Sequence, residues 1–287
     1  MNMSRRFIIT ADDYGMCDVV DKAIDDCIEA GLLTSTNVIV NMDDIDAVKT
    51  LRKRYPQISI GMHWNLTDGV PVCNTADIKT LVDPETGKFW KVLSFMKRFK
   101  KGLINKEEMR KELLAQYEIF QKYCGKADYW NVHENSSIAF SIFGVYNSLA
   151  LELGITKTRN FQRVYTSPSG IPAGLKGKVV EFIKKIVFDI WFGHFVKSTG
   201  TKMPDGRMMY FNMTDKTSNI DNIGKNVRWG KKELVELVIH PATTADHPSF
   251  GLWRDVRPAE WMMFTDPKTK QYLAEQNIEI VTFDEVL

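Results

Sequence analysis

The stretch FIITADDYG, residues 7–15, determines the expected fold at the very start of the chain. Phe7–Thr10 is a short apolar run typical of a buried strand, and the ADDYG turn follows it directly. Apolar residues then recur at helical spacing from Val20 to Ile28, and Gly31 stands where a helix-terminating glycine belongs. This stretch therefore predicts a strand followed by a helix, the first βα unit of a parallel sheet.

The same alternation of short apolar runs and amphipathic segments continues along the 287 residues. It predicts strands at Thr34–Asn41, Ile58–His63, Tyr129–His133, Gly154–Arg159, Glu236–Ala242 and Ile278–Phe283. It predicts helices at Ile45–Tyr55, Lys106–Tyr123, 145–153 and Thr269–Gln276. The expected fold is an α/β class, irregular (β/α) TIM-like barrel with a largely parallel strand core, formed by one domain over residues 1–287. Two segments depart from the pattern, which predicts a long loop at Leu66–Lys101 and an insertion or lid near residues 161–230.

Composition narrows the classes of partner. The net charge is +2, from 38 basic and 36 acidic residues, so no overall field favours nucleic acid or an anionic membrane. The most apolar window, Val179–Val196, is interrupted by charged residues, which argues against a membrane span. It favours core packing or a subunit interface, so a homodimer is one possible assembly. The four cysteines have no CxxC spacing and the N-terminal apolar run is too short for a signal peptide. These features predict a cytoplasmic protein that acts on a small neutral molecule.

Acidic and histidine side chains stand at the carboxyl ends of four predicted strands. They are Asp12 and Asp13 after the first strand, and His63, His133 and His240 at the ends of later ones. In parallel α/β barrels these ends meet at one rim, where active sites are built. Each residue alone has a structural explanation, such as helix capping by the aspartates. Their shared position favours a common site.

Two imidazoles and one carboxylate form a common set of ligands for a catalytic metal ion that keeps positions open for water and substrate. A nearby carboxylate, Asp12 or Asp13, could deprotonate the water, and a separate histidine could protonate a leaving amine. The pattern favours metal-assisted amide hydrolysis.

Several motifs in order resemble the YdjC-like carbohydrate deacetylases, a family that includes chitooligosaccharide deacetylases. TADDYGMC is similar to an N-terminal ADDFG motif, EAGLLTSTNVIVN to a G-hydrophobic-TSTxxxVN segment, and IGMHWNLTDGVPV to a GxHxxLTxGxP segment. KEEMRKELLAQYEIF resembles a helix with the pattern E-L-x-x-Q, and VIHPA resembles a late HPA or HPG motif. Several independent motifs in the right order are more specific than one short pattern.

The resemblance implies removal of acetyl groups from N-acetylated sugars or oligosaccharides. It implies that one divalent metal ion is bound by Asp13, His63 and His133, with Asp12 as general base. Similarity to the wider NodB-type deacetylases implies His240 as general acid and Arg159 as the residue that orients Asp12. The resemblance suggests magnesium, whereas two imidazole ligands favour zinc or manganese.

One segment departs from the family pattern. Relatives carry a histidine-rich DSHxHVH segment, and this chain has NVHENSS, which keeps His133 and places Asn135 and Ser137 where later histidines stand. The natural substrate can therefore differ from chitooligosaccharides. Two alternatives stay open: a metal-dependent hydrolase of another small amide or an ester, and a non-catalytic sugar-binding regulatory protein. A pure binder needs neither the base Asp12 nor the acid His240.

Overall fold

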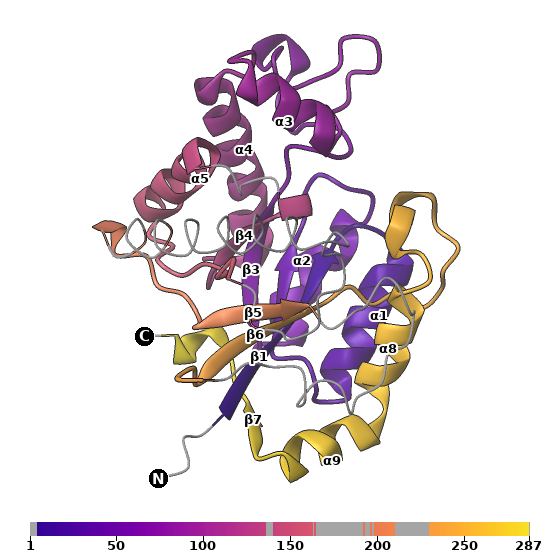
Figure 1. Cartoon of the computed structure of the whole chain (residues 1–287). Helices are drawn as coiled ribbons and strands as arrows, with labels where there is room; N and C mark the ends of the chain where they lie inside the picture. The colour runs from indigo at the N-terminus through magenta and orange to yellow at the C-terminus, as the bar shows by residue number, and fades with distance from the viewer. Residues whose placement is uncertain are drawn as a thin grey trace, which may run out of the picture.

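The computed structural model describes residues 5–135, 140–162, 164, 192, 196, 198–209 and 230–286. At its centre is a sheet with the strand order β4-β3-β2-β1-β6-β5, and β7 also pairs with β1 (Figure 1). The strands are β1 (Arg5–Tyr14), β2 (Ser35–Val38), β3 (Ser59–Trp64), β4 (Trp130–Val132), β5 (Gly206–Met209), β6 (Leu234–Ile239) and β7 (Ile278–Ile280). Every pairing between them is parallel, so their carboxyl ends share one rim. The predicted α/β fold with a parallel core is confirmed.

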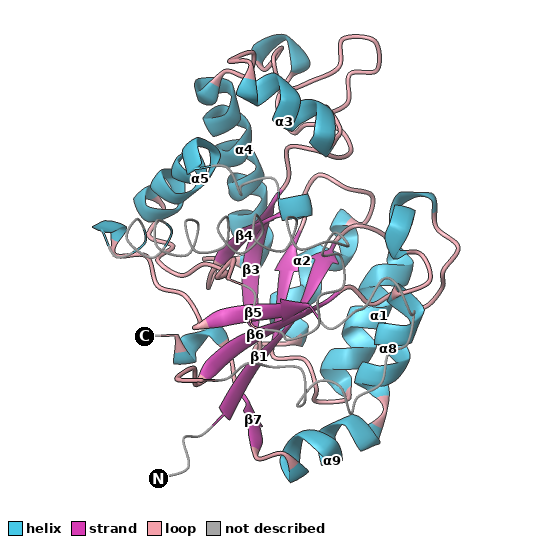
Figure 2. Ribbon diagram, in the orientation of Figure 1, coloured by secondary structure: helices cyan, strands magenta, loops and turns pink. Residues whose placement is uncertain are grey.

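Helices surround the strands, as Figure 2 shows. They are α1 (Asp18–Glu29), α2 (Ile45–Arg54), α3 (Val92–Lys100), α4 (Lys106–Cys124), α5 (Phe140–Glu152), α8 (Arg257–Thr265) and α9 (Pro267–Glu275). Helix α1 packs against α8, and α4 packs against both α2 and α5. The capping side chains of Asp44 and Asn105 accept backbone N–H groups at the starts of α2 and α4. Local capping and apolar spacing thus fix α2 and α4 where the sequence pattern predicts them.

Strand β1 is the most extensively paired strand of the sheet, with three partners. Its first residues pair with β7, its last residues pair with β2, and β6 runs along its other edge. Phe7, Ile8 and Ile9 are completely buried. An apolar run that is buried on both faces is typical of a strand inside a parallel α/β fold.

Residues 156–162 join the two outer strands of this sheet and curl it into an irregular barrel. On one side the Trp130 N–H of β4 donates to the Lys157 carbonyl at 3.1 Å. On the other side the Arg207 N–H of β5 donates to the Gln162 carbonyl at 2.8 Å. The prediction of a regular strand at Gly154–Arg159 is corrected here, because only single-residue bridges form at 157 and 158.

Three further differences from the sequence-based expectation concern an element boundary and elements that the pattern does not reveal. Residues 66–101 are not a structureless loop, because they contain α3 and a 3-10 turn at Thr75–Asp77. Strand β1 continues to Tyr14, so Asp12 and Asp13 lie within its end and not in the turn after it. The pattern does not reveal β5 or α8. Most of the predicted insertion at 161–230 lies outside the described residues, and of Val179–Val196 only Phe192 and Val196 are described, both buried.

Two findings bear on where the chain acts. None of the described helices is both long enough and apolar enough to cross a membrane. All four cysteines are free, and Cys17, Cys27 and Cys124 are buried. The cytoplasmic location stays a prediction.

Candidate metal and catalytic site

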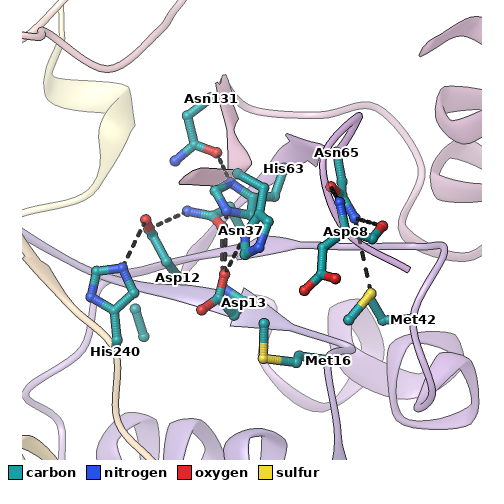
Figure 3. Close-up of polar contacts among 12 residues, drawn as sticks. Asp12, Asp13, Met16, Asn37, Met42, His63, Asn65, Asp68, Asn131 and His240 are labelled. Carbon is teal, nitrogen blue, oxygen red and sulfur yellow. Dashed lines mark hydrogen bonds and ion pairs between the residues drawn. The ribbon is translucent and has the colours of Figure 1, made fainter. Parts of the chain in front are cut away.

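The end of β1 carries a bulge that places two consecutive carboxylates at the rim. The pairing of β1 with β2 shifts register between Ala11 and Tyr14. Asp13 has a φ of 78°, a left-handed conformation that is unusual for a residue other than glycine. Neighbouring side chains of a regular strand point to opposite faces, whereas a bulge can redirect one of them. Asp12 and Asp13 are both buried and lie side by side in Figure 3.

Asp13, His63 and His133 form a buried cluster with the composition of a metal site. One ligand atom from each residue lies within 4.8 Å of the others. Oδ1 of Asp13 is 3.0 Å from Nδ1 of His133 and 3.4 Å from Nε2 of His63. His63 comes from β3 and His133 directly follows β4, and Nδ1 of His63 pairs with the Asn131 side chain. This contact turns Nε2 of His63 towards the cluster, as ligating histidines require.

The charges around the cluster favour an ionised Asp13. Burial raises the pKa of Asp13, but the charges of His133 and Arg257 and hydrogen bonds from His133 and His63 outweigh it and hold the pKa well below its usual value. For His133, burial lowers the pKa, but the Asp13 carboxylate outweighs it, so the net shift is upward. This carboxylate and the two imidazoles compete for the same protons. A divalent cation bound between them can take the place of those protons.

Asp12 belongs to a buried ion network beside the cluster. Nη1 and Nη2 of Arg159 donate to its two carboxylate oxygens, both at 2.7 Å. The same guanidinium donates to Glu236 of β6 at 2.9–3.1 Å, and Asn37 of β2 donates to Asp12 Oδ1 at 2.6 Å. Burial raises the pKa of Asp12, but the adjacent Arg159 outweighs burial, so the pKa lies far below its usual value. The structure thus brings Arg159 directly onto Asp12, where it fixes the carboxylate plane.

His240 directly follows β6 and faces Asp12 across the rim (Figure 3). Its Nε2 atom lies 3.6 Å from Oδ2 of Asp12. Burial, with help from the charges of Arg257 and Arg159, lowers the pKa of His240 to about 4, although Asp12 and Asp13 oppose this shift. The imidazole is therefore neutral at pH 7 in the metal-free site. It can accept a proton from one neighbour and donate one to another.

Helix α4 holds the loop that follows β3. Glu112 is completely buried and accepts the backbone N–H groups of Val72 and Cys73 at 2.9 and 2.8 Å. Gln116 accepts the N–H of Asn65 at 3.1 Å and donates to its carbonyl at 2.7 Å. The E-L-x-x-Q pattern of this helix therefore positions the loop next to His63.

Five polar residues of the site are missing from the sequence-based prediction. Two of them, Asn37 and Asn131, are polar interruptions in predicted strands, and Glu236 is the one charge inside LVELVI, so a search for buried polar residues could have found them. Arg257 and Glu260 of α8 carry no such signal. Of the two positions at which NVHENSS departs from the family pattern, Asn135 is the last residue of the described segment 5–135, and Ser137 lies outside the described residues.

The fold and this cluster define a parallel α/β barrel with a histidine and carboxylate site at its carboxyl-end rim. A profile of the family described as YdjC-like protein matches residues 6–275. The chain belongs to this family.

Individual relatives agree with that assignment. A Xenopus laevis protein named carbohydrate deacetylase is 33% identical over 158 residues, which are 54% of this chain and 50% of that protein. A Clostridium beijerinckii protein of the same name is 25% identical over 282 residues, covering 98% of this chain and 100% of that protein. A solved structure from Enterococcus faecalis V583, named for cellobiose-phosphate cleavage, is 22% identical, covers 98% of each chain and has a TM-score of 0.69. The match thus spans about half of the vertebrate relative and the whole of the clostridial one.

Proposed function

We propose that the protein is a metal-dependent hydrolase that removes acetyl groups from N-acetylated sugars or oligosaccharides. The observation that carries this proposal is the arrangement at the rim, where the Asp13, His63 and His133 cluster adjoins the Asp12 and His240 pair. Membership of a family whose curated relatives are named carbohydrate deacetylases supports the substrate class. The arrangement contains both a ligand set and proton-transfer groups, which amide hydrolysis needs.

The residues of the cluster fit one divalent metal ion. Two neutral imidazoles and one carboxylate are the donors of many hydrolytic metal sites. The atoms of Asp13 and His63 that point away from the cluster are held by neighbours, Oδ2 of Asp13 by Arg257 and Nδ1 of His63 by Asn131. When bound, the metal would polarise the acetyl carbonyl and acidify a water molecule. The resemblance to the family suggests magnesium, whereas the imidazoles favour zinc or manganese, and we expect a transition metal to support higher activity.

Asp12 is the proposed general base. Its carboxylate is fixed by Arg159 and Asn37, and Oδ2 faces His240. A carboxylate whose pKa is held this low is a weak base, so it needs an acidified water as its proton source. This requirement links the role of Asp12 to the adjacent metal cluster.

His240 is the proposed general acid. The tetrahedral intermediate of amide cleavage collapses to an amine only if the leaving nitrogen is protonated. His240 is neutral at pH 7 before the reaction, so it must gain its proton within the cycle. Oδ2 of Asp12, at 3.6 Å from Nε2, is the group from which it takes the proton of the attacking water. Asp12 and His240 thus move one proton from the water to the leaving amine.

The proposal is tested by measuring acetate release from a panel of N-acetylated mono- and oligosaccharides with magnesium, manganese, zinc or cobalt added to metal-free protein. We expect acetate and free amine to appear together with at least one sugar and one metal. Acetate released from O-acetylated sugars, with none from the N-acetylated panel, would instead favour an esterase. Sugar binding without any turnover would favour a regulatory sugar-binding protein.

A further inference from the structure

Arg257 lies at the start of α8 and makes a buried contact with the metal cluster. The side chain is almost completely buried, and its Nη2 atom donates to Oδ2 of Asp13 at 2.6 Å. Its guanidinium lies over the ring of Phe250, with the central carbon 4.6 Å from the ring centroid. Ion pairing on one side and ring packing on the other leave Arg257 little freedom to move.

The two oxygens of Asp13 therefore have different neighbours. Oδ2 is occupied by Arg257, whereas Oδ1 faces Nδ1 of His133 and Nε2 of His63 at 3.0 and 3.4 Å. Rotation of the carboxylate would break the bond to Arg257 and leave a buried guanidinium without its counter-ion, which is costly. Arg257 thus directs a single oxygen of Asp13 towards the space between the two histidines.

The same helical turn also contacts the other half of the site. Glu260 is buried three residues further along α8, and its Oε2 atom accepts the backbone N–H of His240 at 2.6 Å. The carbonyl of Arg257 accepts the N–H of Ala242 at 3.3 Å, which ties this turn to the segment that follows β6. One turn of helix therefore contacts the residue that would ligate the metal and the residue that would protonate the amine.

We propose that the first turn of α8 sets the geometry of the site, with Arg257 positioning Asp13 for metal binding and Glu260 positioning His240 for proton transfer. The inference rests on the proposed function for the roles of Asp13 and His240. A guanidinium next to a bound cation is electrostatically unfavourable, so its contribution to affinity must be geometric. Removal of a group that orients a metal ligand typically weakens metal binding about 10- to 100-fold.

The experiment for Arg257 measures metal affinity without substrate. Zinc and cobalt are titrated into metal-free wild type, Arg257→Met and Arg257→Lys, and folding is checked by urea unfolding of the same samples. We expect the dissociation constant to rise about 10- to 100-fold in Arg257→Met and less in Arg257→Lys, which keeps one donor. Arg254→Met is the matched control, because Arg254 is exposed and pairs only loosely with Asp246 at 3.5 Å. A folded Arg257→Met protein with wild-type affinity would overturn the assignment.

The experiment for Glu260 follows the His240 ring directly. Nitrogen-15 histidine spectra are compared for wild type, Glu260→Gln, which keeps an acceptor oxygen, and Glu260→Leu, which removes it. We expect the His240 signals to shift or broaden in Glu260→Leu and to return towards wild type in Glu260→Gln, with metal affinity within about twofold of wild type in both. Unchanged His240 signals in Glu260→Leu would refute the role of Glu260. Because neither readout needs turnover, a wild type that releases no acetate would defeat the proposed function and leave this inference to be decided separately.

Discussion

Replacement of Arg159 by methionine should destabilise the protein strongly. Arg159 is buried between two buried carboxylates and donates to both oxygens of Asp12 at 2.7 Å and to Glu236 at 2.9–3.1 Å. Among the described residues, Arg159 is the one side chain for which we find an ion pair with both of these acids, and Arg159→Met removes it. Breaking a buried ion pair by removal of one partner costs about 3–5 kcal/mol.

The size of this loss should depend on pH in a definite direction. Arg159 and its hydrogen bonds hold the folded-state pKa of Asp12 below the ordinary value of 3.8, which burial alone would raise. A depressed carboxyl pKa contributes stability that is present above the unfolded-state pKa and is lost as pH falls through the folded-state pKa. The difference between wild type and Arg159→Met should therefore be greatest near neutral pH. It should shrink as the pH falls, first through the raised pKa of the buried Asp12 in the variant and then towards its depressed pKa in the wild type.

Urea unfolding of metal-free protein at several pH values measures both effects. Arg110→Met is the control, because Arg110 forms an exposed ion pair with Glu152, and its loss should cost less than about 1 kcal/mol. If Arg159→Met and Arg110→Met unfolded at the same urea concentration at pH 7, the buried network would not be the stabilising and orienting unit described here.

Three further predictions concern the rim. His63→Ala or His133→Ala should abolish metal binding while the fold is kept, as elemental analysis with circular dichroism would show; full occupancy in either variant would reject the ligand set. Asp13→Asn should weaken metal binding, whereas Asp12→Asn should keep the metal and lose roughly a hundredfold or more in turnover; equal metal loss would contradict this division. His240→Ala should impair N-deacetylation far more than hydrolysis of an activated aryl acetate, at unchanged metal content, because only the amine needs protonation. Equal loss of both activities would make His240 a scaffold residue.

The features that the sequence predicts are those with a local signal. The apolar runs that become β1, β3 and β6 are recognisable because a parallel strand is buried on both faces. Their carboxyl ends lie at one rim for a topological reason, so the proximity of Asp13, His63 and His133 follows from strand position alone. Strand position also brings Asp12 and His240 to the same rim, so the choice of Asp13, His63 and His133 as ligands depends on the resemblance to the family.

The features that the sequence does not predict depend on contacts between distant residues. Arg257 is 244 positions from Asp13, and nothing in its neighbourhood marks it as a partner of that carboxylate. Arg159 and Glu236 are 77 positions apart, and only the closure of the barrel brings them together. The left-handed conformation of Asp13 arises from the bulge in its pairing with β2, which residue types alone do not indicate. Hydrophobic periodicity describes one element at a time and contains no information about such pairs.

The central claim is hydrolysis of an N-acetyl group by a metal-loaded site, and the most direct test counts products. Acetate and free amine are quantified from one N-acetylated sugar with metal-free protein, with protein reloaded with one metal equivalent, and with reloaded His63→Ala. The account predicts equal amounts of acetate and amine from the reloaded wild type and neither product from the other two samples. Equal turnover by the metal-free protein, or neither acetate nor amine from the reloaded wild type, would contradict it.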